Sequence, residues 1–170
     1  MLYQIKVTLF TVQIETNKRK DFTRQYLVES LPGVNDPDTF NQLSALSSDE
    51  IIRMTDVLED SVFDNYEVYS ASIDSMQLLQ DIDTFNVPSN SNDLSIYKVT
   101  YTVSNTVMDK NGNTKTRTKK PKFFVTADSI ESFMKTDIQD QFKSDKDFSQ
   151  FETVKLSSIA ETSITKMLKL

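Results

Sequence analysis

The sequence predicts an α+β protein built from two tandem β-β-α-β repeats, with antiparallel sheet, packed helices and a pseudo-two-fold relation between the repeats. The first observation is a self-match without a gap, in which residues 2–9 align with residues 96–103. The second is that each copy continues through a basic turn, a second apolar strand, a helical pattern and a closing strand. Self-similarity of this kind indicates a duplicated unit. We therefore predict a first repeat at 1–85 with an expanded helical segment, a linker at 86–94 and a second repeat at 95–170.

The strands of the first repeat are predicted from alternation. Apolar and polar residues alternate over 3–9, which is typical of a half-buried strand. A basic turn at 15–20 leads into a return strand at 22–28, so the two strands form an antiparallel hairpin. A third strand begins at 66–69, and the pattern at 76–79 fits either a strand or a helix.

The segment between these strands carries two helix-start signals. Asp36 before Pro37 predicts an N-cap followed by the first helical residue. Ser47 and Glu50 have the spacing of a capping box. The second signal precedes apolar residues that share one helical face, namely Ile51, Met54 and Leu58. We predict two helices here, or one kinked helix.

The second repeat opens with a strand at residue 96. Asn111-Gly112 predicts a tight hairpin turn because both residues tolerate positive φ. The return strand at 123–125 follows Pro121, which lacks an N–H and so places the strand at an edge or at a bulge. Asp128 and Glu131 predict the cap of a helix whose apolar positions are Ile130, Phe133, Met134, Ile138 and Phe142.

A closing strand at 151–156 aligns with residues 66–71, an offset of 85 residues. The opening strands differ by 94 residues and the return strands by 97. The second hairpin is therefore predicted to be three residues longer, and the second helical segment twelve residues shorter. Length differences of this kind fall where loops tolerate them.

Composition excludes several classes of chemistry. The chain of 170 residues has no Cys and no His, which excludes disulfides, a Ser-His-Asp triad and any imidazole or thiolate metal site. Its two glycines lie far apart, so neither a Walker loop nor a dinucleotide fingerprint is present. The acidic pairs sit where helix starts and turns favour Asp and Glu, which makes a carboxylate-based metal enzyme the weakest interpretation. We expect no enzymatic activity, no cofactor and no small-molecule substrate.

The N-terminal residues alternate like a strand and do not have the pattern of a signal peptide. No apolar run approaches the ~18 residues of a membrane helix. We therefore expect a soluble, intracellular protein with no membrane partner.

Charge is the most distinctive surface feature. The chain carries a net charge of −6, but the window 109–122 carries +5, so the rest of the chain carries −11. We take the cations of both hairpins as candidate interaction residues: Lys18, Arg19, Lys20 and Arg24 in the first, and Lys110, Lys115, Arg117, Lys119, Lys120 and Lys122 in the second. Three interpretations stay open. The cations contact nucleic-acid phosphates, they dock on an acidic protein surface, or they protect an exposed edge hairpin against aggregation.

Several motifs together resemble one known family. They are the Tyr-x-Val-x-Tyr strand at 97–101, the basic hairpin, Phe-Val-Thr-Ala-Asp at 124–128 leading into a helix, and the stretch 156–164 with its Ile-Ala-Glu-Thr segment. In the first copy, residues 26–30 are similar to the family's Tyr-Leu-Val-Asp-Ala element, whereas the helical stretch 34–62 departs from the family. The family is a domain-of-unknown-function family of gut Bacteroidetes and their phages, including crAss-like phages. It has no assigned catalytic residues, so the resemblance implies none here.

The resemblance and the composition together lead us to expect a non-enzymatic phage protein that acts through protein–protein surfaces. The expected role is a virion accessory component, either an auxiliary capsid protein or a head-to-tail protein. Its expected location is the virion, after assembly in the cytoplasm of a bacterial host. Expected partners are other phage structural proteins or copies of itself. The alternative is a nucleic-acid-binding accessory of phage replication that uses the basic hairpins.

Overall fold

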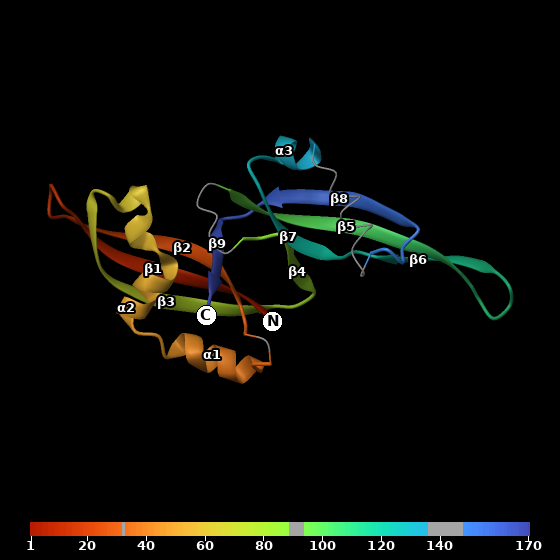
Figure 1. Ribbon diagram of the computed structural model, residues 1–170, viewed down its shortest axis with the longest axis horizontal. Helices are drawn as coiled ribbons and strands as arrows, with labels where there is room; N and C mark the ends of the chain where they lie inside the picture. Colours follow the sequence, from red (N-terminus) through yellow and green to blue (C-terminus); the bar gives the residue numbers. More distant parts are fainter. Residues whose placement is uncertain (32, 89–93, 136–147) are drawn as a thin grey trace. The chain divides into compact units, whose positions relative to one another are not determined.

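The computed structural model describes residues 1–31, 33–88, 94–135 and 148–170, and it has a mixed α+β fold dominated by sheet (Figure 1). The chain divides into two compact units. The first contains residues 1–80 and 163–170, and the second contains residues 81–87 and the described part of 94–162. These units cut across the predicted boundaries, because each includes a short segment from the other half of the chain. Predicted helix positions Ile138 and Phe142, and most of the predicted linker, lie outside the described residues.

The first unit contains four strands, two α-helices and two short 3-10 turns among its described residues. In chain order these are β1 (Leu2–Gln13), β2 (Arg19–Glu29), α1 (Asp36–Ser44), α2 (Ser48–Thr55), η1 (Val57–Glu59), η2 (Ser61–Phe63), β3 (Tyr66–Leu79) and β9 (Ile164–Lys169). The strand order is β3-β1-β2-β9. β1 is antiparallel to both β2 and β3, whereas β9 lies parallel to β2.

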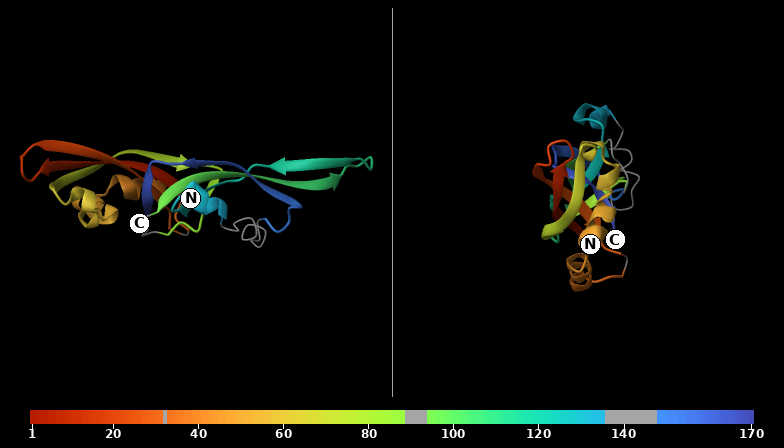
Figure 2. Two further views of the ribbon diagram at one scale, coloured as in Figure 1. Left: turned by 90° about the horizontal axis from the view of Figure 1, so that it is seen from above. Right: turned by 90° about the vertical axis from the view of Figure 1, so that its left-hand side faces the viewer.

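The core of this unit lies between the sheet and the helices. Alternate residues of β1 are buried, as the sequence predicts: Tyr3, Ile5, Val7 and Leu9. Leu43 of α1 and Ile51 and Ile52 of α2 pack into the same cluster, so both helices cover one face of the sheet (Figure 2). The N-terminus of α2 is fixed to β3, because the Ala71 N–H donates to Ser48 Oγ at 2.8 Å.

The helix caps differ in part from the prediction. The capping box of Ser47 and Glu50 is confirmed. For α1, however, the N-cap is Asn35, whose side chain accepts from the Asp38 N–H at 3.0 Å, and Asp36 is already helical. Pro37 fits because no backbone N–H has an intrahelical partner this early in a helix. The predicted place of Leu58 on the α2 face was wrong, since the helix ends at Asp56 in a left-handed conformation and Leu58 is 68% exposed.

The second unit contains five strands in one connected sheet and a short helix among its described residues. They are β4 (Ile82–Phe85), β5 (Ser95–Met108), β6 (Thr114–Lys119), β7 (Lys122–Ala127), α3 (Ile130–Lys135) and β8 (Thr153–Glu161). β5 is central: β6 and β7 pair in turn along one side, and β8 pairs along the other, all antiparallel. β4 lies parallel to β7 on its outer side.

The core of the second unit uses the same alternation. Tyr97, Val99, Tyr101 and Val103 of β5 are buried together with Phe123 and Val125 of β7. Phe133 adds the only buried side chain of α3, and the N-terminus of that helix is capped by Ser129, whose Oγ accepts from the Ser132 N–H at 3.0 Å. The predicted cap at Asp128 was therefore one residue too early.

Both central strands have one irregularity with their third-strand partner. In the first unit the register shifts between Lys6 and Val7, leaving Asp74 as the extra residue on β3, and Thr8 Oγ1 donates to Asp74 Oδ2 at 2.5 Å. In the second unit the register shifts between Thr100 and Tyr101, leaving Ser157 as the extra residue on β8. The Ser157 hydroxyl is hydrogen-bonded to that of Thr102.

β4 and β9 are the two strands that the sequence pattern did not predict. β4 follows β3 in the chain but pairs with β7 of the second unit. β9 follows β8 but pairs with β2 of the first unit. Each sheet is therefore completed by a parallel strand that comes from the other half of the sequence.

Candidate interaction surface

The hairpin of β5 and β6, which we call the basic arm (residues 103–120), is the most exposed sheet of the molecule. Pairing between β8 and β5 ends at Ser104, so β5 beyond that residue pairs only with β6. All six residues of β6 are exposed. The views in Figure 1 and Figure 2 follow this two-stranded ribbon past the end of β8.

The turn of the basic arm is longer than the sequence pattern predicts. The Gly112 N–H donates to the Asp109 carbonyl at 3.1 Å, and the Asp109 N–H donates to the Asn113 carbonyl at 2.8 Å. Gly112 has a φ of +78°, whereas Asn111 does not have positive φ. This is the three-residue loop in which a turn is followed by one left-handed glycine, not the predicted two-residue turn.

Asp109 holds this turn together. Its Oδ1 accepts from the N–H groups of Asn111 and Asn113, both at 2.9 Å. The backbone N–H of Asn113, followed by that of Asn111, favours the charged carboxylate and lowers the pKa of Asp109 below its ordinary value. Lys115 adds an ion pair to Asp109 at 3.6 Å. The turn residues that the notion of a calcium loop would require are thus engaged in shaping the hairpin.

The cations of β6 lie on one face. Lys115, Arg117 and Lys119 stand opposite Val107, Asn105 and Val103. Paired residues in a sheet share a face, so these three cations lie on the face to which Val103 contributes its buried side chain. Lys110, Arg117, Lys120 and Lys122 are exposed and make no ion pair with any residue of the described ranges.

The outer edge of β6 has no strand partner among the described residues. Backbone hydrogen bonds to β5 are made by odd-numbered residues of the return strand, as in the bonds from Tyr101 to Pro121 and from Asp109 to Asn113. Because the direction of N–H and C=O groups alternates along a strand, the backbone groups of Thr114, Thr116 and Thr118 point away from β5. These three residues therefore present an open ladder position.

Pro121 separates β6 from β7 without changing the register. Val103 stands opposite Lys119 and Thr100 opposite Lys122, so no bulge intervenes. The outer neighbour β4 begins to pair only at Lys122. Pro121 is therefore at the open edge, which confirms the predicted edge position and rules out the predicted alternative of a bulge.

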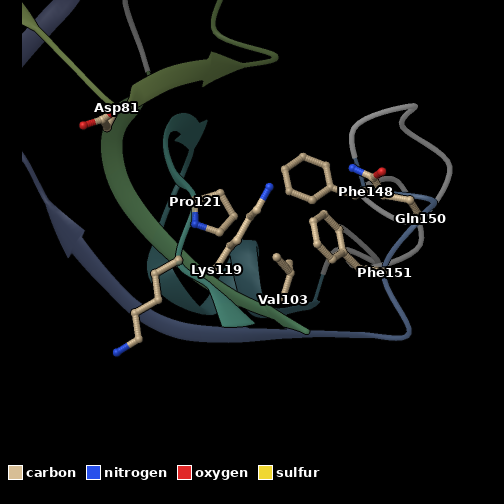
Figure 3. Close-up of a pocket in the computed structure, with 8 residues that line it drawn as sticks. Asp81, Val103, Lys119, Pro121, Phe148, Gln150 and Phe151 are labelled. Atoms are coloured by element: carbon tan, nitrogen blue, oxygen red, sulfur yellow. The ribbon is translucent and has the colours of Figure 1, made fainter. Parts of the chain in front are cut away.

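A pocket of about 430 Å³ lies at the base of the basic arm. Its lining combines apolar and charged side chains: Asp81, Val103, Lys119, Lys120, Pro121, Phe148, Gln150 and Phe151. Figure 3 shows Lys119 running between Pro121 and the rings of Phe148 and Phe151. The Lys119 ammonium is 5.9 Å from the centroid of the Phe151 ring, within the range of a cation–π contact.

The cations of the β1–β2 hairpin are engaged with aromatic rings of their own unit. Lys20 Nζ lies 4.9 Å from the Phe22 centroid, and the Arg24 guanidinium lies 5.5 Å from that of Phe63. Arg19 forms an ion pair with Asp21 at 3.1 Å and lies 5.4 Å from the ring of Phe10. Lys18 is exposed in the turn.

The ten predicted cations thus form two groups, one in each unit, with different surroundings. The first group is largely packed on aromatic side chains, while the second group surrounds an open edge and a pocket. The sequence pattern missed Phe148 and Phe151, which lie about thirty residues from Lys119 in the chain. Only the spacing of two phenylalanines within four residues marks them, and this spacing does not indicate their partner.

No family model, no curated protein and no solved structure matches this chain. The resemblance to the phage-associated family therefore stays a prediction. No group of three or more acidic side chains gathers in a metal-binding arrangement within the described ranges. Among the same residues, no helix has the length and apolar character needed to cross a membrane.

Proposed function

We propose that the protein acts through a binding surface on the basic arm, as a non-enzymatic virion accessory of a phage, either an auxiliary capsid or a head-to-tail component. One observation carries the proposal. The arm exposes every residue of β6, leaves its outer backbone edge open and places three cations on one face. Native proteins usually shorten, cover or bulge such edges, so a long open edge next to a pocket favours a contact surface.

We also propose that the chain is a duplicated unit, as the self-match predicts. The registers support this, because Val154 lies opposite Val103 as Ala71 lies opposite Leu9, and the two third-strand residues are 83 apart. The sequence alignment of those strands had placed them 85 apart. With the opening strands 94 apart, both register shifts fall at equivalent positions, and both extra residues contact the equivalent threonine, Thr8 or Thr102.

The same spacing of 83 residues extends to the exchanged strands. Phe85 stands opposite Val125 on β7, and Leu168 stands opposite Val28 on β2. Val125 follows Val28 by 97 residues, the offset of the return strands. Such a reciprocal exchange treats both halves alike, which supports the predicted pseudo-two-fold relation.

Mass spectrometry of purified phage particles tests the virion role. We expect the protein in intact particles, at a constant ratio to the major capsid protein through successive density-gradient fractions. A non-structural phage enzyme from the same lysate serves as the control for carry-over. Absence of the protein from particles in which the control is also absent would remove the virion proposal.

A second candidate function is nucleic-acid binding by the basic arm. The alternation of Lys115, Arg117 and Lys119 on one ribbon face favours it, because a row of cations is suited to a phosphate backbone. A gel-shift assay at low salt tests it with a variant in which Lys119, Lys120 and Lys122 become Glu. The matched control changes Lys98 and Lys155, which are exposed on β5 and β8, to Glu. Equal mobility shifts with both variants, or no shift with the wild type, would end this candidate.

A further inference from the structure

The outer edge of β6 has the dimensions and the backbone pattern of a strand-addition site. Thr114, Thr116 and Thr118 direct their N–H and C=O groups to that side, and no described strand pairs there. Six strand residues span roughly 20 Å. A peptide added along this length would gain main-chain hydrogen bonds independently of its sequence, which is how edge strands recognise extended segments.

The next part of the same edge already holds an added strand. β4, only four residues long, pairs in parallel with β7 from Lys122 to Val125. It comes from the other half of the sequence, so its place on β7 is filled by a segment that the hairpin itself does not supply. A second strand placed on β6 would continue along the line of β4.

Charge complementarity defines the chemistry of that second strand. Lys115, Arg117 and Lys119 project on one face of β6, and Lys120 and Lys122 follow, so the edge has a high density of positive charge. An added strand places every second side chain on the same face. Acidic residues at alternate positions would lie beside these cations.

The pocket defines one further position. It opens beside Lys119, and Val103, Pro121, Phe148 and Phe151 give it apolar walls. A volume of about 430 Å³ is ample for one aromatic side chain, and lysine on the rim complements an acidic neighbour. The pocket therefore adds side-chain selectivity to a backbone interaction that has none.

We propose that the outer edge of β6 binds an acidic, extended segment of a partner protein by β-strand addition, with one aromatic side chain of that segment in the pocket beside Lys119. This inference rests on the proposed function, because it names the binding mode and partner chemistry of the same arm. It differs from simple charge docking, since it requires the backbone groups of β6. It differs from nucleic-acid binding, since it requires a strand that donates and accepts main-chain hydrogen bonds.

The test uses the full chain and a fluorescent peptide, Glu-Thr-Glu-Thr-Phe-Thr-Glu-Thr-Glu, whose symmetric pattern serves either strand direction. Fluorescence anisotropy should show binding that weakens with added salt. A peptide with Lys in place of Glu should not bind, and one with Ala in place of Phe should bind at least tenfold more weakly. These peptide controls leave the protein unchanged.

Thr116→Pro tests the backbone contribution. It removes an N–H that points outward, so pairing between β6 and β5 is retained, and peptide binding should weaken about tenfold. Thr116→Ala keeps the N–H and is the matched control. In the wild type, peptide binding should also slow hydrogen exchange at the outward amides of Thr116 and Thr118, a readout that does not depend on any variant.

Each other outcome overturns the inference in a recognisable way. Equal affinity of Thr116→Pro and wild type, with no added amide protection, would mean that charge alone holds the peptide. Tight binding of an oligonucleotide with no preference for the acidic peptide would favour the nucleic-acid candidate. No binding of either probe would mean that the cations only protect the edge. The presence of the protein in particles would sustain the proposed function in all three cases.

Discussion

Shortening Leu168 to alanine should destabilise the first unit, although this residue follows the whole second unit in the chain. Leu168 is 2% exposed, stands opposite Val28 on β2 and belongs to the core cluster of the first unit. Buried Leu→Ala changes cost about 2–5 kcal/mol, and a value of about 3 kcal/mol fits a well-buried residue on an outer strand. That cost corresponds to about a hundredfold increase in the opening equilibrium of the unit.

Native-state hydrogen exchange measures this effect residue by residue. Exchange at the amides of Tyr26 to Val28 should accelerate by about a hundredfold, while amides of β7 keep their protection. Lys169→Ala is the matched control, because Lys169 is exposed on the same strand and its loss should stay within about 0.5 kcal/mol. Phe85→Ala on β4 should produce the reverse pattern, with faster exchange in β7 and little change in β2.

The reasoning would be refuted in either of two ways. Leu168→Ala might cost less than about 1 kcal/mol, which would mean that β9 contributes little to the core that includes Val28. Alternatively, exchange might accelerate in β7 and remain slow in β2. The second result would mean that β9 belongs to the second unit in solution.

Three further predictions concern ionisable groups and the arm. Lys166 is 5% exposed and its ammonium pairs with Asp56 at 2.9 Å, so Asp56→Asn should cost about 1–3 kcal/mol by leaving a buried charge unpaired, whereas Lys166→Met should be close to neutral in chemical denaturation. Burial raises the pKa of Tyr26 and of Tyr101 to about 12. Because the folded pKa lies above the unfolded value, the associated stability is complete below about pH 10 and is lost as the pH rises towards about 12, and ultraviolet titration should show two of the six phenols still protonated at about pH 11. Gly112→Ala has open space for its methyl group but a φ of +78°, so it should cost about 1–2 kcal/mol and accelerate amide exchange in the basic arm alone.

Local patterns predicted the parts of the fold that local interactions determine. The alternation at Tyr3, Ile5 and Val7 identified a half-buried strand because burial on one face of a sheet repeats every second residue. The capping box at Ser47 was readable because both of its hydrogen bonds join residues three positions apart. The caps at Asn35 and Ser129 were misplaced by one residue, since an adjacent Asp offers a carboxylate that the sequence alone does not distinguish from the group that binds.

Contacts between distant segments could not be read in this way. β4 and β9 are short, and nothing in their own residues specifies that they join β7 and β2 in parallel. Their spacing of 83 residues is a usable signal, but it depends on the correct offset of the preceding strands. The pocket was hidden for the same reason, because Phe151 approaches Lys119 only through the pairing of β8 with β5.

The parallel placement of β9 has a consequence for biosynthesis. When β1, β2 and β3 have left the ribosome, the edge of β2 is still vacant, because its partner is encoded at residues 164–169. β4 likewise emerges before β7 exists. Domains generally fold as they are synthesised, from the N-terminus onward, but here the first sheet stays incomplete until translation reaches β9. During that interval the outer edge of β2 is open to other nascent chains on the same polysome, so spacing between ribosomes and chaperone occupancy should govern the yield of correctly paired protein.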